Sequence, residues 1–142
     1  MTRLDFSNES GVRIQRKIFE DVFDVFTKMF KNKGGITLVL VDDKAIKKIN
    51  SKWRKKNKTT DVISFAYLEG KKMPLLGVIG DIFISMDTAN RQAKEHKHSL
   101  EKELQILFTH GLLHVFGFDH QNDSQEKEME KWAKKILKQV HA

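Results

Sequence analysis

The sequence contains no cysteine, a single proline and no long apolar run. The lack of cysteine excludes a disulfide framework, a thiolate metal site and a cysteine nucleophile, so any metal ion must bind histidine or carboxylate groups. No apolar segment approaches the roughly 18 residues that cross a bilayer, and the first residues, MTRLDFSNES, lack the apolar stretch of a signal peptide. We therefore expect a cytoplasmic protein that has no membrane partner.

The composition is that of a small basic domain. The 142 residues include 39% hydrophobic residues, among them 10 Phe, which suffices for a core. We expect one domain over residues 1–142, acting as a monomer. The 26 Lys and Arg exceed the 19 Asp and Glu and give a net charge of +7. This excess favours a polyanionic partner through attraction to phosphates, although many basic proteins have no such partner.

Four segments have the pattern of strands. The β-branched run at 36–41 (ITLVLV) predicts a buried strand that follows Gly34-Gly35, and the residues at 61–67 alternate between apolar and polar. The other two predicted strands are at 2–7 and 77–85. The only proline, Pro74, falls in the loop between the strands predicted at 61–67 and 77–85.

Five segments predict helices through apolar spacing or capping residues. The segment from Glu103 to Phe118 is apolar nearly all round, so we expect it to be the buried central helix. Trp53 continues the apolar face of the second helix and is expected in the core. The expected helix starts are Val12, Asp42-Asp43, Asp87, Ser99 and the capping box Asp123-x-x-Glu126. The order of elements predicts an α+β fold with a mixed sheet of three or four strands covered by about five helices.

The most informative segment runs from His110 through His114 to His120, with the spacing H-x3-H-x5-H. Residues at i and i+4 lie about 6 Å apart along a helix axis, so the first two rings can face one ion. Gly117 can end the helix in a left-handed conformation and turn the chain back, which brings the third ring to the site. Three neutral imidazoles predict one divalent metal ion, with zinc expected, and leave a fourth position for water.

Two other interpretations of these histidines were weighed. A histidine pair on an apolar helix can be a hydrogen-bonded core pair, but three of the 6 His fall within eleven residues here, and their nitrogens would need partners if buried. The spacing also matches H-E-x-x-H-x-x-G-x-x-H metallopeptidases. Gly111 occupies the position of their glutamate base, which disfavours a peptidase. His96, His98 and His141 stand in polar surroundings and are expected to be exposed without a role.

The motif H-G-x-L-H-x-x-G-x-D-H, over residues 110–120, resembles the signature of the YbeY family of bacterial rRNA maturation factors. The segment from Asn50 through Trp53-Arg54 to Thr60-Asp61-Val62-Ile63-Ser64-Phe65 resembles the arginine segment and the following strand of that family. Gly80-Asp81-Ile82 resembles its G-D-I strand. The resemblance implies a single-strand-specific, metal-dependent endoribonuclease that matures the 3′ end of small-subunit rRNA and serves ribosome quality control. The implied partners are ribosomal RNA and the small ribosomal subunit.

Roles for individual residues follow from chemistry and from the resemblance. Arg54 matches the family's arginine, and its planar fork can hold two phosphate oxygens, so we expect it and the metal ligand His114 to be catalytic. Asp119 either supports a ligand histidine, accepts a proton or bonds backbone at the helix end. Water and the RNA 2′-hydroxyl are both candidate nucleophiles. The expected RNA-binding residues are Lys52, Arg54, Lys55, Lys56 and Lys58. Trp53 beside them could act as a stacking platform for RNA, but its place on the apolar face of its helix favours the core.

Two further functions stay open beside the ribonuclease. One is a noncatalytic ribosome assembly factor with a structural metal, and the other is a metallopeptidase with an unusual base.

Overall fold

The computed structural model describes residues 3–67 and 77–142. Over these ranges it contains four strands and five helices, so the predicted α+β class is confirmed. The predicted loop that holds Pro74 lies outside the described residues. In chain order the elements are β1 (Leu4–Asn8), α1 (Lys17–Phe30), β2 (Gly35–Val41), α2 (Asp43–Arg54), β3 (Val62–Ala66), β4 (Val78–Ser85), α3 (Met86–His96), α4 (Leu100–Val115) and α5 (Asp123–Val140).

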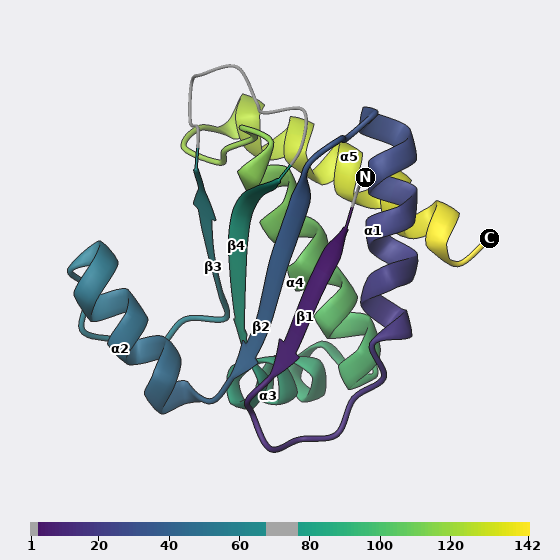
Figure 1. Cartoon of the computed structure of the whole chain (residues 1–142). Coiled ribbons are helices and arrows are strands. Elements are labelled where there is room, and N and C mark those ends of the chain that lie inside the picture. The colour runs from purple at the N-terminus through teal and green to yellow at the C-terminus, as the bar shows by residue number, and fades with distance from the viewer. Residues whose placement is uncertain (1–2, 68–76) are drawn as a thin grey trace.

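The strands form one mixed sheet in the order β1-β2-β4-β3 (Figure 1). β2 pairs in parallel with both β1 and β4, whereas β3 is antiparallel to β4. β3 is therefore an edge strand. Successive side chains of a strand point to opposite faces of the sheet. In β3, Val62 and Ser64 therefore point to one face, and Ile63 and Phe65 point to the other.

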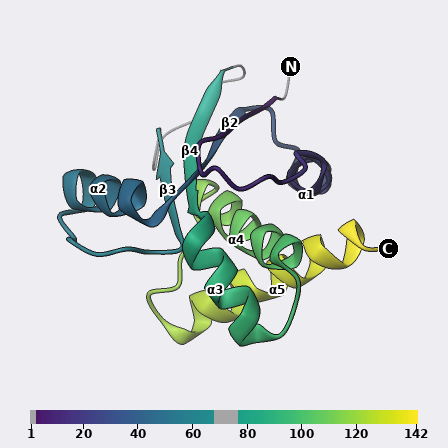
Figure 2. The ribbon, with the colours of Figure 1, turned by 90° about the horizontal axis from the view of Figure 1, so that it is seen from below.

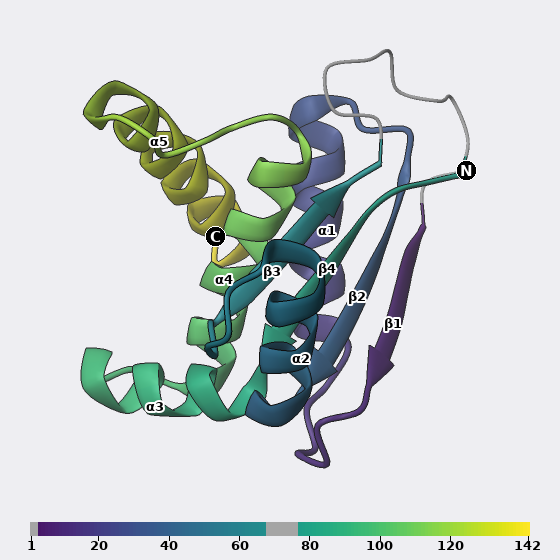
Figure 3. The same cartoon turned by 90° about the vertical axis from the view of Figure 1, so that its left-hand side faces the viewer.

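Helices cover the two faces of the sheet unequally. α1 and α4 lie on one face, with α5 packed outside them, and α2 lies on the other face (Figures 2 and 3). The larger apolar core lies between the sheet and the α1–α4 layer and includes Leu38 and Leu40 of β2. The alternate residues Val39 and Val41 pack in the smaller cluster under α2. No helix within the described ranges has both the length and the apolar character that crossing a membrane requires.

α4 is the buried central helix that the sequence predicts. Phe108 and Leu112 are fully buried, and the ring of Phe108 meets that of Phe19 in α1 edge to face at 5.6 Å. The buried polar side chains of this helix are paired: Gln105 Nε2 donates to the Ile18 carbonyl at 3.1 Å, and Thr109 Oγ1 donates to the Gln105 carbonyl at 2.7 Å. Because these polar groups are hydrogen-bonded, their burial does not leave unsatisfied donors or acceptors, and the bonds hold the helix against the sheet.

Two predicted helix starts are confirmed in detail. The Asp42 carboxylate accepts the N–H of Ala45 at 2.8 Å and caps α2. The Ser99 hydroxyl accepts the N–H of Lys102 at 3.1 Å and caps α4. Each bond satisfies an N–H group that has no partner inside its helix.

Two predicted starts and one predicted cap are wrong. α1 begins at Lys17 rather than near Val12, because the side chain of Asn8 bonds the N–H of Ser10 and the carbonyl of Val12 and holds this segment in a turn. α3 is capped by Ser85 rather than Asp87. α5 begins at Asp123 as predicted, but its cap is Asn122 rather than the predicted capping box: the Asn122 side chain accepts the N–H of Gln125 at 2.9 Å.

Candidate metal centre and adjoining cleft

The C-terminal end of α4 positions the three histidines. His110 and His114 lie four residues apart on its last turns, so both side chains leave the helix on one face. The helix then ends at a turn in which Gly117 N–H donates to the His114 carbonyl at 3.0 Å. Gly117 has a φ of +99°, which confirms the predicted left-handed turn. The turn brings His120 back beside His114, with their ring centroids 5.0 Å apart.

All three histidines line one cavity of about 270 Å³. The ligand atoms that lie within 4.8 Å of one another are those of His114, Asp119 and His120, which could hold a metal ion. His110 lines the same cavity but is not part of this close group. The other residues that line the cavity are Asp61, Val62, Glu126, Met129 and Glu130.

The surroundings of His110 and His114 favour the neutral form of both rings. Burial lowers the pKa of His110, against the opposing charges of Glu130 and Asp61. Burial also lowers the pKa of His114, and the neighbouring His120 lowers it further. A neutral imidazole has a free lone pair, so these rings are in the state that binds a metal ion at neutral pH.

Asp119 occupies the turn between α4 and His120. Its Oδ1 accepts the backbone N–H of His120 at 2.7 Å, so the carboxylate fixes the backbone of the residue that carries the third ring. This is the helix-end hydrogen bond that was one of the predicted alternatives. The same carboxylate also belongs to the close group with His114 and His120, so it lies at the centre itself.

A larger cleft of about 590 Å³ adjoins the cavity. His114, His120 and Asp61 line both, so the cleft and the cavity share one wall. Arg54, the last residue of α2, lines this cleft. Among the residues that the structure describes, the Arg54 side chain has no ion-pair or hydrogen-bond partner, so its guanidinium is available to an anion.

The four predicted RNA-binding lysines surround the end of α2 rather than line the cleft. Lys52, Lys55, Lys56 and Lys58 are all exposed, and within residues 3–67 and 77–142 none of them pairs with an acid. Lys55 ends the helix in a left-handed conformation, with a φ of 56°. We call these four lysines and Arg54 the basic rim; of the five residues, Arg54 lines the cleft itself.

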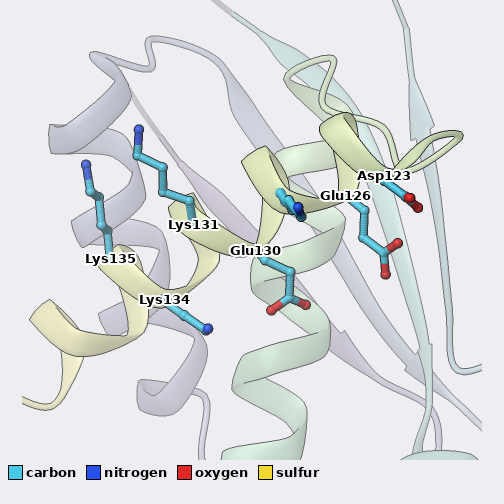
Figure 4. A pocket seen from close by; sticks show the side chains of 7 residues that line it. Asp123, Glu126, Glu130, Lys131, Lys134 and Lys135 are labelled. Carbon is cyan, nitrogen blue, oxygen red and sulfur yellow. The ribbon is translucent and has the colours of Figure 1, made fainter.

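Acidic residues around the histidines were not predicted. Asp61 precedes β3, and Glu126 and Glu130 lie one turn apart on α5. Figure 4 shows that Glu126 and Glu130 leave α5 on one side, whereas Lys131 and Lys135 leave it on another. The acidic side of α5 therefore faces the histidine cavity. The only signal in the sequence was their i, i+4 spacing beside the apolar position Met129.

A second cluster corrects the expectation that His96 and His98 have no role. His96 Nδ1 and His98 Nε2 lie 2.9 and 2.6 Å from Oε1 of Glu103, whose side chain is only 2% exposed. These three residues form the other group within the described part of the chain that could hold a metal ion. The two rings also satisfy a buried carboxylate near the start of α4. His141 is exposed, as expected.

Trp53 is a second correction, because it is 65% exposed rather than part of the core. Its ring meets Phe65 of the edge strand β3 at a centroid distance of 6.5 Å, and no strand of the described sheet lies beyond β3 to cover the rest.

Histidines with lowered pKa values, carboxylates beside them and a free arginine in the adjoining cleft are typical of metal-dependent hydrolases that act on anionic substrates. The chain matches the family model described as endoribonuclease YbeY over residues 5–141. The endoribonuclease YbeY of Nautilia profundicola is 40% identical over 123 residues, which cover 87% of this chain and 82% of that relative. The endoribonuclease YbeY of Mycoplasma mobile is 36% identical, over 97% of this chain and 94% of the relative. The chain therefore belongs to the endoribonuclease YbeY family, as its motifs predict.

A solved structure agrees with this assignment. The solution structure of a protein from Thermotoga maritima has a TM-score of 0.67 to this chain at 26% identity. The match covers 96% of this chain and 88% of that protein, so the likeness extends over the whole fold rather than the histidine segment alone.

Proposed function

We propose that the chain is a metal-dependent endoribonuclease that cleaves single-stranded RNA at the cavity lined by His110, His114 and His120. The observation that carries this proposal is the shared wall: His114 and His120 line both the histidine cavity and the cleft that contains Arg54. A phosphate that enters the cleft can therefore contact a cationic side chain while it faces the metal ligands. Family membership supports the same reaction, since the relatives bear the name endoribonuclease YbeY.

The residues present fit a divalent metal ion. Two imidazoles whose pKa values are lowered, a third ring beside them and the Asp119 carboxylate are nitrogen and oxygen donors of the kind zinc prefers. We assign the ion to His110, His114 and His120, with Asp119 as their support, and zinc as its identity. When bound, the ion would supply Lewis acidity toward a phosphoryl group.

The chain's own residues supply substrate positioning and charge. The Arg54 guanidinium would hold two phosphate oxygens at once and stabilise the negative charge that grows on them during cleavage. The carboxylates of Asp61 and Asp119 line the same cleft and are the groups placed to accept a proton. The basic rim would attract the RNA backbone without regard to base sequence.

The proposal extends to the biological setting. The substrate is ribosomal RNA, with the 3′ end of the small-subunit RNA as the processed site, and the partner is the small ribosomal subunit. The protein would act as a monomer in the cytoplasm, in rRNA maturation and ribosome quality control.

A noncatalytic assembly factor with a structural metal is the alternative, and it predicts tight ribosome binding without cleavage. A peptidase is disfavoured by packing as well as by chemistry. A Cβ atom on Gly111 would lie 2.9 Å from a side-chain carbon of Ile82, so the position of the peptidase base is a close helix–sheet contact. A carboxylate side chain does not fit there.

The test combines elemental analysis with RNA cleavage by the purified protein and two matched variants. His114→Ala should lose the metal and the cleavage of a single-stranded RNA while it stays folded. His96→Ala removes a histidine from the second candidate group and should keep both the metal and the RNA cleavage. Loss of metal from His96→Ala but not from His114→Ala would contradict the assignment. Metal-loaded protein that binds ribosomes but cleaves RNA no faster than the metal-free control would favour the assembly factor.

A further inference from the structure

Trp53 exposes a large apolar ring where the fold gives it no cover. It is 65% exposed, the highest value among the exposed large hydrophobic side chains of the described residues. Covering the ring with a partner would favour binding by roughly 25 cal/mol per Å² of apolar area. A single exposed apolar side chain does not by itself mark a binding surface, so the residues around the ring decide what it can bind.

The ring is held in place although it is exposed. It meets the Phe65 ring in a T-shaped arrangement at 6.5 Å and 71°, and Phe65 in turn meets Phe83 of β4 at 6.1 Å and 79°. Lys52 Nζ lies 5.1 Å from the ring centroid. These contacts fix the indole at the outer side of β3 and reduce the side-chain entropy that binding a flat ligand would otherwise cost.

Trp53 also lies next to the proposed phosphate ligand. Arg54 follows it directly, so their Cα atoms are about 3.8 Å apart, and Arg54 lines the cleft with His114 and His120. The other lysines of the basic rim, Lys55, Lys56 and Lys58, follow Trp53 within five residues of the chain and have no acid partner among the described residues. A positive track with an open aromatic face is the arrangement that binds single-stranded nucleic acids, in which phosphates meet cations and bases stack on rings.

We propose that Trp53 is a stacking site for an unpaired nucleobase of the RNA strand whose phosphate Arg54 holds. This inference rests on the proposed function and adds a residue that selects single strands. The bases of a duplex are stacked within the helix and cannot reach the indole, whereas an unpaired base can turn outward onto it. A protein partner is the competing occupant, but the five cations of the basic rim, which have no acid partner among the described residues, favour a polyanion.

The sequence allows a direct measurement, because the chain has 2 Trp. In the variant Trp132→Phe the indole of Trp53 is the only one left, so its fluorescence reports on this site alone. The probes are a single-stranded, 2′-O-methylated oligoadenylate and an abasic strand with the same number of phosphates, with intact strands verified on a gel after each titration. We expect oligoadenylate to quench the fluorescence and the abasic strand to leave it nearly unchanged.

Affinity gives a second readout through the anisotropy of labelled strands. Trp53→Ala should weaken binding of oligoadenylate by about 5- to 100-fold, the range for loss of one stacked base. Trp53→Phe should restore most of it, and binding of the abasic strand should not change. Trp132→Phe is the matched control, since the Trp132 ring packs on Phe30 at 5.2 Å and its Nε1 donates to Glu128.

Equal affinity of wild type and Trp53→Ala for oligoadenylate, or an equal loss on both strands, would overturn the inference. If Trp53→Ala weakens binding to ribosomal proteins but not to oligoadenylate, the ring binds a protein partner, and this result would also overturn the inference. Should Trp53→Ala fail to fold, the quenching comparison decides. Base-dependent quenching without RNA cleavage would contradict the proposed nuclease function and support the stacking site. Cleavage without base-dependent binding would support the nuclease function and contradict the stacking site.

Discussion

Gly111 of α4 lies directly against Ile82 of β4, so closely that a Cβ atom on Gly111 would come within 2.9 Å of Ile82 Cγ2. The contact sets how near the helix that carries His110 and His114 approaches the sheet. It also explains why glycine stands between the histidines despite its low helix propensity, which costs about 1 kcal/mol relative to alanine.

We predict that Gly111→Ala lowers the free energy of unfolding by about 1 to 3 kcal/mol, because overpacking the contact outweighs the gain in helix propensity. Gly111→Glu should destabilise more strongly and should not create peptidase activity. Urea denaturation measures both effects. In the background Ile82→Val, which removes Cδ1 from this contact, Gly111→Ala should cost less. A stabilising Gly111→Ala would show that the helix can move away from the sheet freely.

The order of strands and helices follows from local sequence patterns, whereas several boundaries depend on distant contacts. Ser85 caps α3 in place of Asp87, and its hydroxyl also donates to Asp43 at 2.6 Å, 42 residues earlier in the chain. Asp87 is drawn away to accept the N–H of Asp43 at 2.9 Å. Both residues are good caps in isolation, so the choice between them is a tertiary one that local sequence does not contain.

The site divides in the same way. The histidine spacing and the left-handed turn at Gly117 are local and were predicted, and Arg54 was placed by resemblance. Trp53 continues a helical apolar face, but that face extends past the edge strand β3, and edge position is a property of sheet order. The histidines that bind Glu103 and the acidic residues of the histidine cavity come from different elements. The periodicity of the sequence does not specify how these elements pack against one another.

Metal binding should stabilise the protein in a pH-dependent manner. Zinc at 100 times its Kd should raise the free energy of unfolding by about 2.7 kcal/mol, measured as a rise in Tm. His114→Ala should remove this rise, whereas His96→Ala should keep it. Because protons compete for the imidazoles, the rise should shrink as the pH falls from about 7 to 5. A Tm rise that survives in His114→Ala would place the ion elsewhere.

The metal-free protein should lose stability in acid through the same histidines. The pKa values of His110 and His114 are lowered from 6.5 by burial, so the unfolded chain binds more protons than the folded one below about pH 6.5. Their contribution is full above that pH and declines as the pH falls toward the lowered values. Denaturation of the chelator-treated protein at several pH values checks this, and His114→Gln should flatten the decline.

His96 should have the opposite pH dependence. The hydrogen bond to Glu103 raises the pKa of His96 above 6.5, so its contribution to stability is full below about pH 6.5 and is lost as the pH rises through the raised value. We expect His96→Gln to lower Tm more at about pH 5.5 than at about pH 9. His141→Gln, at an exposed histidine without a carboxylate partner among the described residues, is the control and should show no such difference. An equal loss at both pH values would mean that the bond does not depend on charge.

RNA affinity should depend on salt through the basic rim. Lys55→Glu with Lys56→Glu should weaken binding of single-stranded RNA and reduce the slope of log K against log salt by about 1 to 2. The control is Lys134→Glu with Lys138→Glu, which changes the net charge equally at exposed positions toward the far end of α5. If both double variants weaken binding to the same degree, net charge rather than the rim is responsible.

Arg54 should act on the rate of cleavage more than on binding of RNA. Its guanidinium has no partner among the described residues and lines the cleft beside His114 and His120, so it is free to follow charge that develops on a phosphate. Removing one such donor typically lowers kcat by about 10²- to 10³-fold, and we expect this of Arg54→Ala. Arg54→Lys keeps the charge but loses the planar fork, so it should recover binding while kcat stays low. Steady-state kinetics on a short RNA separate the two constants. A rise in KM with kcat unchanged would mean that Arg54 only binds RNA, as is proposed for the lysines of the basic rim, and the phosphate at the reacting centre would then need a different ligand.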